Sequence, residues 1–254
     1  MNQSTVSAVQ SADRIFQIIE LLSRHPKGLA LVDVCRETSL AKATASRLLS
    51  SIVAHGYAVH DEGTRRYRLS MKMFQLGSRV ADSTNILSSA RSYLDELAHK
   101  TGETVHLVTK LGDEVVYLYK EEGGSSLVRT ASFVGLKSPM YCTGVGKSIL
   151  AHLPLSQVKE IWERTDIVKY TDTTIVDFDK FVKELEEIRS KGYALDNEEH
   201  EMGVCCVAVV IKDVNDAPLG AISVSVPTQR LSEDLIQKLA PVVMSTANKI
   251  SSSY

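Results

Sequence analysis

Two short amphipathic segments, separated by only two residues, limit what the N-terminal part of this chain can fold into. Residues 31–38 and residues 41–54 each carry apolar side chains at the spacing of one helical face. Only Ser39 and Leu40 lie between them, so the two helices meet through a tight turn. Helix pairs also occur in ordinary all-α domains, and the pair alone leaves a helix-turn-helix and a plain helical hairpin about equally open.

The outward face of the second segment carries small, polar and basic side chains. Small residues allow close approach to the major groove of DNA, and hydroxyl and basic groups bond to phosphates and base edges. The alternative is the solvated face of an amphipathic helix. The candidate DNA contacts on this segment are Lys42, Thr44, Ser46 and Arg47.

A predicted β-hairpin follows and favours the DNA-binding interpretation. Residues 57–60 and 65–69 form short strand patterns around a turn that contains Gly63. Basic residues at the tip of such a wing reach the DNA backbone and make affinity depend on salt. For any one of them, a solvated hairpin remains the alternative. The candidates are Arg65, Arg66 and Arg68.

Charge is divided unevenly along the chain. Residues 1–76 contain 10 Lys and Arg against 6 Asp and Glu, whereas the remainder contains 19 against 25. Phosphate binding needs positive charge only where the DNA lies. The net charge of −2 is therefore compatible with a basic DNA-binding module joined to an acidic module that has another partner.

The rest of the chain is long enough for a second domain with its own core. Residues 72–99 are helical in pattern, and polar residues at 82–85 interrupt them. Apolar residues on this segment pack either against a partner subunit or onto the second domain. We expect a winged helix-turn-helix at residues 1–70, a helical linker at 71–84 and a larger domain at 85–254.

Strand and helix patterns are mixed in the larger domain. Several strands are joined by short polar turns, which predicts an α+β fold with a mainly antiparallel sheet. The predicted strands are residues 105–109, 115–119, 126–130, 204–211 and 219–226, and the predicted helices are 146–152, 156–164, 178–190 and 233–250.

Targeting and metal-binding signals are weak. The longest apolar runs, such as residues 204–211, are shorter than the ~20 residues of a membrane span, and we expect neither a span nor a secretory signal. Four cysteines, two of them adjacent, suit neither a disulfide framework nor a metal-ligand pair. We expect a cytoplasmic protein without cofactor or metal, and a metal at His200, Cys205 and Cys206 stays an open alternative.

The sequence leaves two other functions as alternatives. Gly146-Lys147-Ser148 resembles the end of a phosphate-binding loop, but the first glycine of that loop would fall on Tyr141. Residues 198–201 lack the HExxH spacing, and no GxSxG motif is present. An enzyme that uses the C-terminal domain is therefore the least favoured alternative. The other is a small-molecule sensor whose basic segment contacts protein or RNA.

Four ordered segments resemble the IclR family of bacterial regulators: residues 31–69, 135–147, 196–208 and 221–227. The resemblance implies a winged helix-turn-helix followed by a GAF-like effector-binding domain. It also implies a homo-oligomer, dimer or tetramer, that binds palindromic half-sites and usually represses. Residues 196–199 are similar to the branch that senses sugar acids such as 2-keto-3-deoxygluconate.

The resemblance also implies an effector pocket. Amides around residues 144–146, at a helix N-terminus, suit a carboxylate. Two serines on one strand face bond to ligand oxygens, and Asp196 accepts hydrogen bonds from hydroxyls. Without the resemblance, Cys206 would be interpreted as a small core residue, and the two serines as a solvent-facing stripe on their strand. The pocket residues implied are Leu127, Thr130, Gly144, Val145, Asp196, Val204, Cys206, Ser223 and Ser225.

Overall fold

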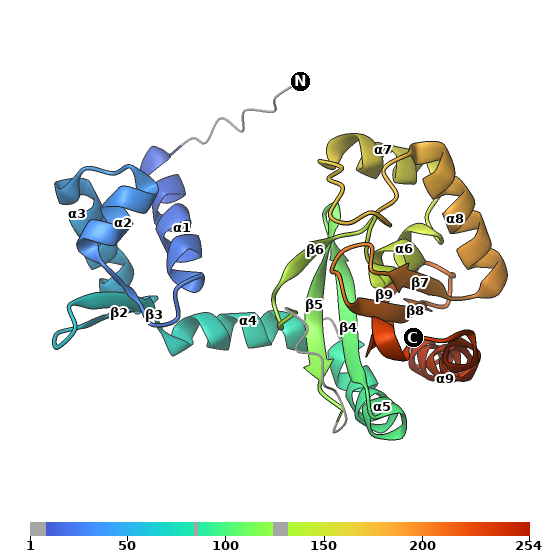
Figure 1. The fold of residues 1–254 in the computed structure, drawn as a ribbon. Helices are drawn as coiled ribbons and strands as arrows, with labels where there is room; N and C mark the ends of the chain where they lie inside the picture. The colour runs from blue at the N-terminus through green and yellow to red at the C-terminus, as the bar shows by residue number, and fades with distance from the viewer. Residues whose placement is uncertain (1–8, 84–85, 124–131) are drawn as a thin grey trace. The chain divides into compact units, whose positions relative to one another are not determined.

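The structure is a computed structural model that describes residues 9–83, 86–123 and 132–254, without the side chains of residues 81–83. The chain forms two compact units, Met1–Ser83 and Thr84–Tyr254 (Figure 1). Each unit has its own buried apolar clusters. The expected α+β class is confirmed, with a winged helix-turn-helix and a mainly antiparallel sheet.

The smaller unit is a helix-turn-helix followed by a β-hairpin and a further helix. Its three strands pair antiparallel in the order β1-β3-β2. Strand β1 was not predicted, because two residues are too short to show a pattern. The elements are α1 (Gln10–Ser23), β1 (Leu29–Ala30), α2 (Leu31–Thr38), α3 (Lys42–Ala54), β2 (Ala58–Asp61), β3 (Arg66–Leu69) and α4 (Met71–Ser83).

One apolar cluster holds this unit together. Ile18 of α1, Val34 of α2 and Leu49 of α3 have no exposed surface. Gly28 allows β1 to lie beside β3, because its φ is +79° and a Cβ there would lie 2.8 Å from the carbonyl oxygen of Tyr67. The α1–β1 loop is thereby fixed against the wing.

The larger unit is built on a six-stranded sheet in the order β6-β5-β4-β9-β8-β7, in which all neighbours are antiparallel. The elements are α5 (Ile86–Thr101), β4 (Thr104–Leu111), β5 (Glu114–Glu121), β6 (Lys137–Pro139), α6 (Gly144–Leu150), α7 (Leu155–Arg164), α8 (Phe178–Lys191), β7 (Ala194–Asn197), β8 (Val204–Lys212), β9 (Pro218–Pro227), η1 (Thr228–Arg230) and α9 (Glu233–Ser251).

The two faces of this sheet carry different layers. Helices α5 and α9 cover one face, and α6 with α7 and α8 lies over the other (Figure 1). Strand β9 shows the division: Ile222, Val224 and Val226 belong to the cluster beneath α5 and α9, whereas Ser223 and Ser225 point to the face covered by α6. The polar serines are thus buried on the face that α6 covers.

Most predicted elements occur close to their expected places, with three differences. Strands β6 and β7 were not predicted. Helix α6 begins at Gly144 and ends at Leu150, two residues earlier than the predicted helix at both ends. The predicted strand at residues 126–130 lies outside the described residues. Among the described helices, none is both long and apolar enough to cross a membrane.

Candidate functional site

The turn between α2 and α3 determines how the second helix is presented. Ser39 has a φ of 56°, in the left-handed region, and ends α2. The Thr38 hydroxyl donates a 2.6 Å hydrogen bond to the Val34 carbonyl and closes the last turn. Helix α3 starts three residues after Ser39, so the chain changes direction within a short distance.

The exposed face of α3 carries positive charge without a partner of opposite sign. Lys42 and Arg47 are exposed, and neither forms an ion pair with any residue that the structure describes. By contrast, Arg36 on α2 pairs with Asp33 and Glu37, at 3.0 and 3.5 Å. The α3 charges are therefore free to meet an external anion. The two predicted hydroxyl contacts, Thr44 and Ser46, are both half-buried.

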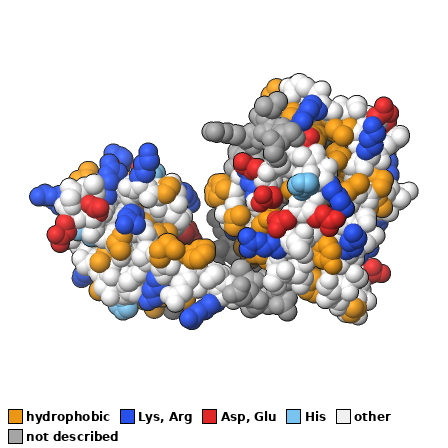
Figure 2. Space-filling model, turned by 90° about the horizontal axis from the view of Figure 1, so that it is seen from below, with side chains coloured by type: hydrophobic (Ala, Val, Ile, Leu, Met, Phe, Trp, Pro, Cys, Tyr) orange, Lys and Arg blue, Asp and Glu red, His pale blue; other side chains and the backbone are white. Residues whose placement is uncertain are grey.

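The three wing arginines differ in what they contact. Arg65, Arg66 and Arg68 are all exposed. The guanidinium of Arg66 donates a 2.8 Å hydrogen bond to the carbonyl of Gly28 and so ties the wing to the α1–β1 loop. Lys and Arg side chains are spread over the face of this unit shown in Figure 2, with few acidic ones among them. No sequence pattern distinguishes Arg66 from the other two.

A cavity in the larger unit brings together the predicted pocket residues that the structure describes. Gly144, Val145, Asp196, Val204, Cys206, Ser223 and Ser225 all line it. They come from α6, β7, β8 and β9, so the pocket lies between α6 and the sheet. Its volume is about 60 Å³, above the ~10–15 Å³ that one water molecule requires. Leu127 and Thr130 lie outside the described residues.

The N-terminus of helix α6 offers fewer free amides to this cavity than the sequence predicted. The hydroxyl of Thr143 accepts a 3.2 Å hydrogen bond from the Gly146 amide and donates a 2.8 Å bond to the Pro139 carbonyl. The Gly146 amide, expected to meet a carboxylate, is therefore already used by the helix's own cap. The prediction was wrong for this amide because the capping role of Thr143 was overlooked.

His106 lies at the centre of a chain of polar contacts in the pocket. Its Nε2 lies 2.8 Å from the Ser132 hydroxyl, and its Nδ1 lies 3.3 Å from the Ser225 hydroxyl. Ser225 in turn lies 3.1 Å from the Cys206 sulfur. Burial, and secondarily the charge of Lys120, lowers the pKa of His106 to about 3. The imidazole is neutral at physiological pH, with one nitrogen donating and one accepting.

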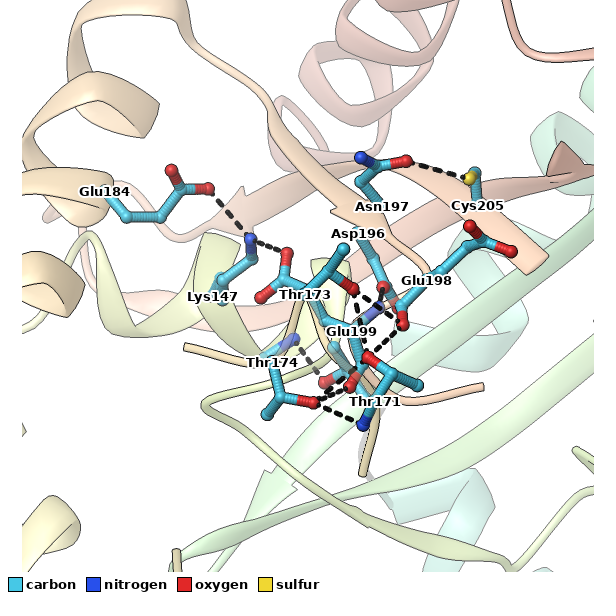
Figure 3. A network of polar contacts seen from close by, with 12 residues as sticks. Lys147, Thr171, Thr173, Thr174, Glu184, Asp196, Asn197, Glu198, Glu199 and Cys205 are labelled. Carbon is cyan, nitrogen blue, oxygen red and sulfur yellow. Dashed lines mark hydrogen bonds and ion pairs between the residues drawn. The ribbon is translucent and has the colours of Figure 1, made fainter. Parts of the chain in front are cut away.

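The turn after β7 forms another wall of the pocket. Asp196 accepts a 2.8 Å hydrogen bond from the Glu199 amide, and Glu198 adopts a left-handed φ of 59° between them. Thr171 and Thr174 donate 2.6 Å bonds to the carbonyls of Glu198 and Glu199. The turn is thus fixed from both sides (Figure 3).

A buried ion cluster lies behind that turn (Figure 3). The Lys147 ammonium contacts Glu199 Oε1 at 2.5 Å and Glu184 Oε1 at 2.8 Å. Only 1% of the Lys147 side chain and 5% of the Glu199 side chain are exposed. Burial lowers the pKa of Lys147, but the two carboxylates more than offset this and hold it above its usual value. The ammonium is engaged on both sides and is not available to a phosphate.

Two family models match the chain. The model of the bacterial transcriptional regulator IclR C-terminal domain matches residues 78–252, and that of the IclR helix-turn-helix domain matches residues 11–62. The chain belongs to the IclR family.

Individual IclR relatives agree with this over nearly the full length. The HTH-type transcriptional regulator KdgR of Escherichia coli K12 is 31% identical, over 96% of this chain and 92% of its own. The DNA-binding transcriptional repressor YiaJ of the same organism is 33% identical, over 95% of this chain and 86% of its own. The crystal structure of Thermotoga maritima IclR matches with a TM-score of 0.82 at 31% identity, over 96% of this chain and 98% of that one. The chain is an IclR-family transcriptional regulator with a helix-turn-helix and a C-terminal effector domain.

The pocket of this IclR-family chain includes further residues that sequence reasoning missed. A polar residue between buried apolar neighbours on β4 was the available signal for His106, because Val105 and Leu107 face the opposite side. Tyr117 lies on β5, a strand that was predicted, and the others lie in loops, turns and the short strand β6, which carry no pattern. The additional lining residues are His106, Tyr117, Ser132, Leu136, Ser138, Thr143, His200 and Glu201.

The adjacent cysteines have separate surroundings. The Cys205 sulfur lies 3.4 Å from both Asn197 and Thr228, whereas the Cys206 sulfur faces Ser225 in the pocket. Neighbouring residues on a strand point to opposite faces, so the two thiols do not converge. Within the described part of the chain, no group of three or more His, Cys, Asp or Glu is arranged to hold a metal ion.

Proposed function

We propose that this regulator binds a palindromic operator through α3 and the wing, and that it acts as a repressor released by a small effector. Support comes from Lys42, Arg47, Arg65 and Arg68, which are exposed and form no ion pair within the described residues. In this arrangement α3 enters the major groove, with Thr44 and Ser46 at its edge, and the wing lies along the backbone. The cytoplasm is the proposed location, because that is where the DNA target lies.

Self-association is part of this proposal. Two half-sites require two copies of α3, and the smaller unit exposes apolar side chains beyond what its own core needs. Phe16 of α1 is 62% exposed and Phe74 of α4 is 69% exposed. Phe16 also lines an apolar groove of about 380 Å³, together with Ile15, Ile19 and Leu76 among others. We assign a second copy of the chain to this surface, in a dimer or a pair of dimers.

The effector proposed is a small organic or sugar acid bound in the cavity between α6 and the sheet. Ser138, Ser223 and Ser225 line this cavity, and their hydroxyl groups suit the oxygen atoms of such a ligand. The volume of about 60 Å³ favours a short acid in the present conformation, so a six-carbon sugar acid requires the pocket to widen. Ligand binding shifts the population between DNA-competent and DNA-incompetent forms.

A binding comparison tests the proposed function. At moderate salt, a palindromic duplex from the regulator's own upstream region should bind at least ~100-fold more tightly than a scrambled duplex of equal length. Equal binding of the two duplexes would instead support the alternative, a sensor whose basic segment contacts protein or RNA.

Arg47→Ala is expected to weaken operator binding by about 1–3 kcal/mol, because a guanidinium contact to DNA is lost from α3. Electrophoretic mobility shift or anisotropy measurements on the palindromic duplex give the affinity. Arg36→Ala is the matched control, because Arg36 is exposed but already paired with Asp33 and Glu37. If the two variants bind equally well, α3 is not the recognition helix.

Combined replacement of Ser223 and Ser225 by alanine is expected to reduce stabilisation of the chain by small acids while leaving operator affinity unchanged. Both hydroxyls face the cavity from one side of β9, and each lost hydrogen bond costs about 0.5–1.5 kcal/mol. A thermal-shift screen of keto, hydroxy and sugar acids measures the loss. Unaltered responses to every acid that stabilises the parent chain would refute the pocket assignment.

A further inference from the structure

Negative charge exceeds positive charge in the buried cluster behind the effector pocket. The ammonium of Lys147 contacts Glu199 and Glu184 (Figure 3), and its charge also acts on a third carboxylate, that of Asp196. Asp196 is only 6% exposed and Glu199 only 4%. A buried carboxylate without a cation is costly, and such a group usually takes up a proton instead.

The hydrogen bonds show which carboxylates Lys147 serves. Its ammonium forms hydrogen bonds to Oε1 of Glu199 and Oε1 of Glu184, whereas on Asp196 it acts only through its charge. Glu199 Oε2 is buried and has no hydrogen-bond partner in the described structure. Asp196 Oδ1 accepts from the Glu199 amide, and the same carboxyl group lines the cavity. Asp196 therefore faces the effector without a cation in direct contact, because the ammonium of Lys147 is paired with the two glutamates.

The other groups around Asp196 do not supply a positive charge. The turn carries Glu199, His200 and Glu201, and burial lowers the pKa of His200. From the sheet, His106 is neutral, and burial raises the pKa values of Tyr117 and Cys206, so both keep their protons. Burial likewise raises the pKa of Cys142, which precedes α6. No Lys or Arg is among the described lining residues of the cavity.

The physical consequence is a shifted protonation equilibrium at the pocket wall. Burial, and secondarily the negative charge of Glu199, raises the pKa of Asp196 to about 7. A protonated carboxyl group donates a hydrogen bond through its O–H, whereas an ionised one only accepts. In the ionised form it also repels an anionic ligand.

We propose that Asp196 receives the effector as a neutral carboxylic acid that donates a hydrogen bond to a carboxylate oxygen of the ligand. The assignment rests on the proposed function of the pocket and specifies the ligand group met there: an anionic acceptor, not a hydroxyl donor. When Asp196 is ionised beforehand, binding one acid anion takes up one proton from solvent. Affinity then falls up to about tenfold for each pH unit above the pKa of Asp196.

Protonation is tested first, without any ligand. Infrared difference spectra between the full-length chain and Asp196→Asn should contain a carboxylic acid carbonyl band at pH 6 that weakens by pH 8. A difference spectrum without this band at pH 6 overturns the proposal. This measurement involves no DNA, so a failure of operator binding would leave its result intact.

The donor role is tested with pyruvate, a short acid that carries the carboxylate which the proposal requires. Pyruvate should raise the melting temperature of the full-length chain several-fold more at pH 6 than at pH 8. Asp196→Asn, which keeps a donor but cannot ionise, should respond equally at both pH values. Asp213→Asn is the control, because its carboxylate bonds only to amides of its own turn, and it should behave like the parent chain. Three results for the unmodified chain overturn the proposal: pyruvate does not raise its melting temperature at pH 6, raises it equally at both pH values, or raises it more at pH 8.

Discussion

Gly146→Ala is expected to destabilise the larger unit by at least ~4 kcal/mol, beyond the range of ordinary substitutions. A Cβ at this position would lie 2.3 Å from both the Cα and the carbonyl oxygen of Met140. Backbone atoms cannot move aside like a flexible side chain, so α6 must shift away from the segment before it. Trp162 is the only tryptophan and packs against Phe181 in this unit, so its fluorescence during urea unfolding measures the loss.

Gly112→Asn is the control for that experiment. Gly112 has a φ of +64° and nothing lies within 4 Å of a Cβ built there, and asparagine tolerates this backbone conformation. We expect a change of less than ~1 kcal/mol. Equal losses for the two variants would mean that α6 does not approach Met140 as closely as the structure has it.

Lys147→Met is expected to destabilise the larger unit by about 3–5 kcal/mol, because removing one partner of a buried ion pair leaves the other charge uncompensated. Glu199 loses its ammonium contact at one oxygen, and its other oxygen already has no partner. Trp162 fluorescence in urea again gives the free energy of unfolding.

Two further variants separate charge from packing at this position. Lys159→Met removes an exposed lysine that lies 3.9 Å from Glu163, and should change stability by no more than ~0.5 kcal/mol. Lys147→Met combined with Glu199→Gln should recover part of the loss, because the uncompensated charge is gone. A double variant less stable than Lys147→Met would contradict the charge argument.

Regular periodicity made much of the fold predictable from the sequence. Helix α2 occurs at residues 31–38 as expected, and α3, the wing and the β8–β9 pair lie close to their predicted places. Strands β1, β6 and β7 were missed because they are only two to four residues long. Their formation depends on partner strands far away in the sequence, which no local pattern reveals.

Residue patterns alone predicted less of the pocket than of the fold. Asp196, Cys206 and Ser223 came from family resemblance, since a buried serine and a surface serine look alike in a sequence. His106 was missed although its alternation with Val105 and Leu107 was visible. The contact between Lys147 and Glu199 joins residues 52 positions apart, so only the folded chain reveals it.

The apolar clusters have a consequence for how such a chain can diversify. Each cluster draws its buried residues from one side of the Ser83/Thr84 boundary. Recombination at this point would keep all the buried residues of each cluster together, so neither hydrophobic core would lose part of its packing. New combinations of operator and metabolite could therefore arise by exchanging whole gene segments, without compensating substitutions in either hydrophobic interior.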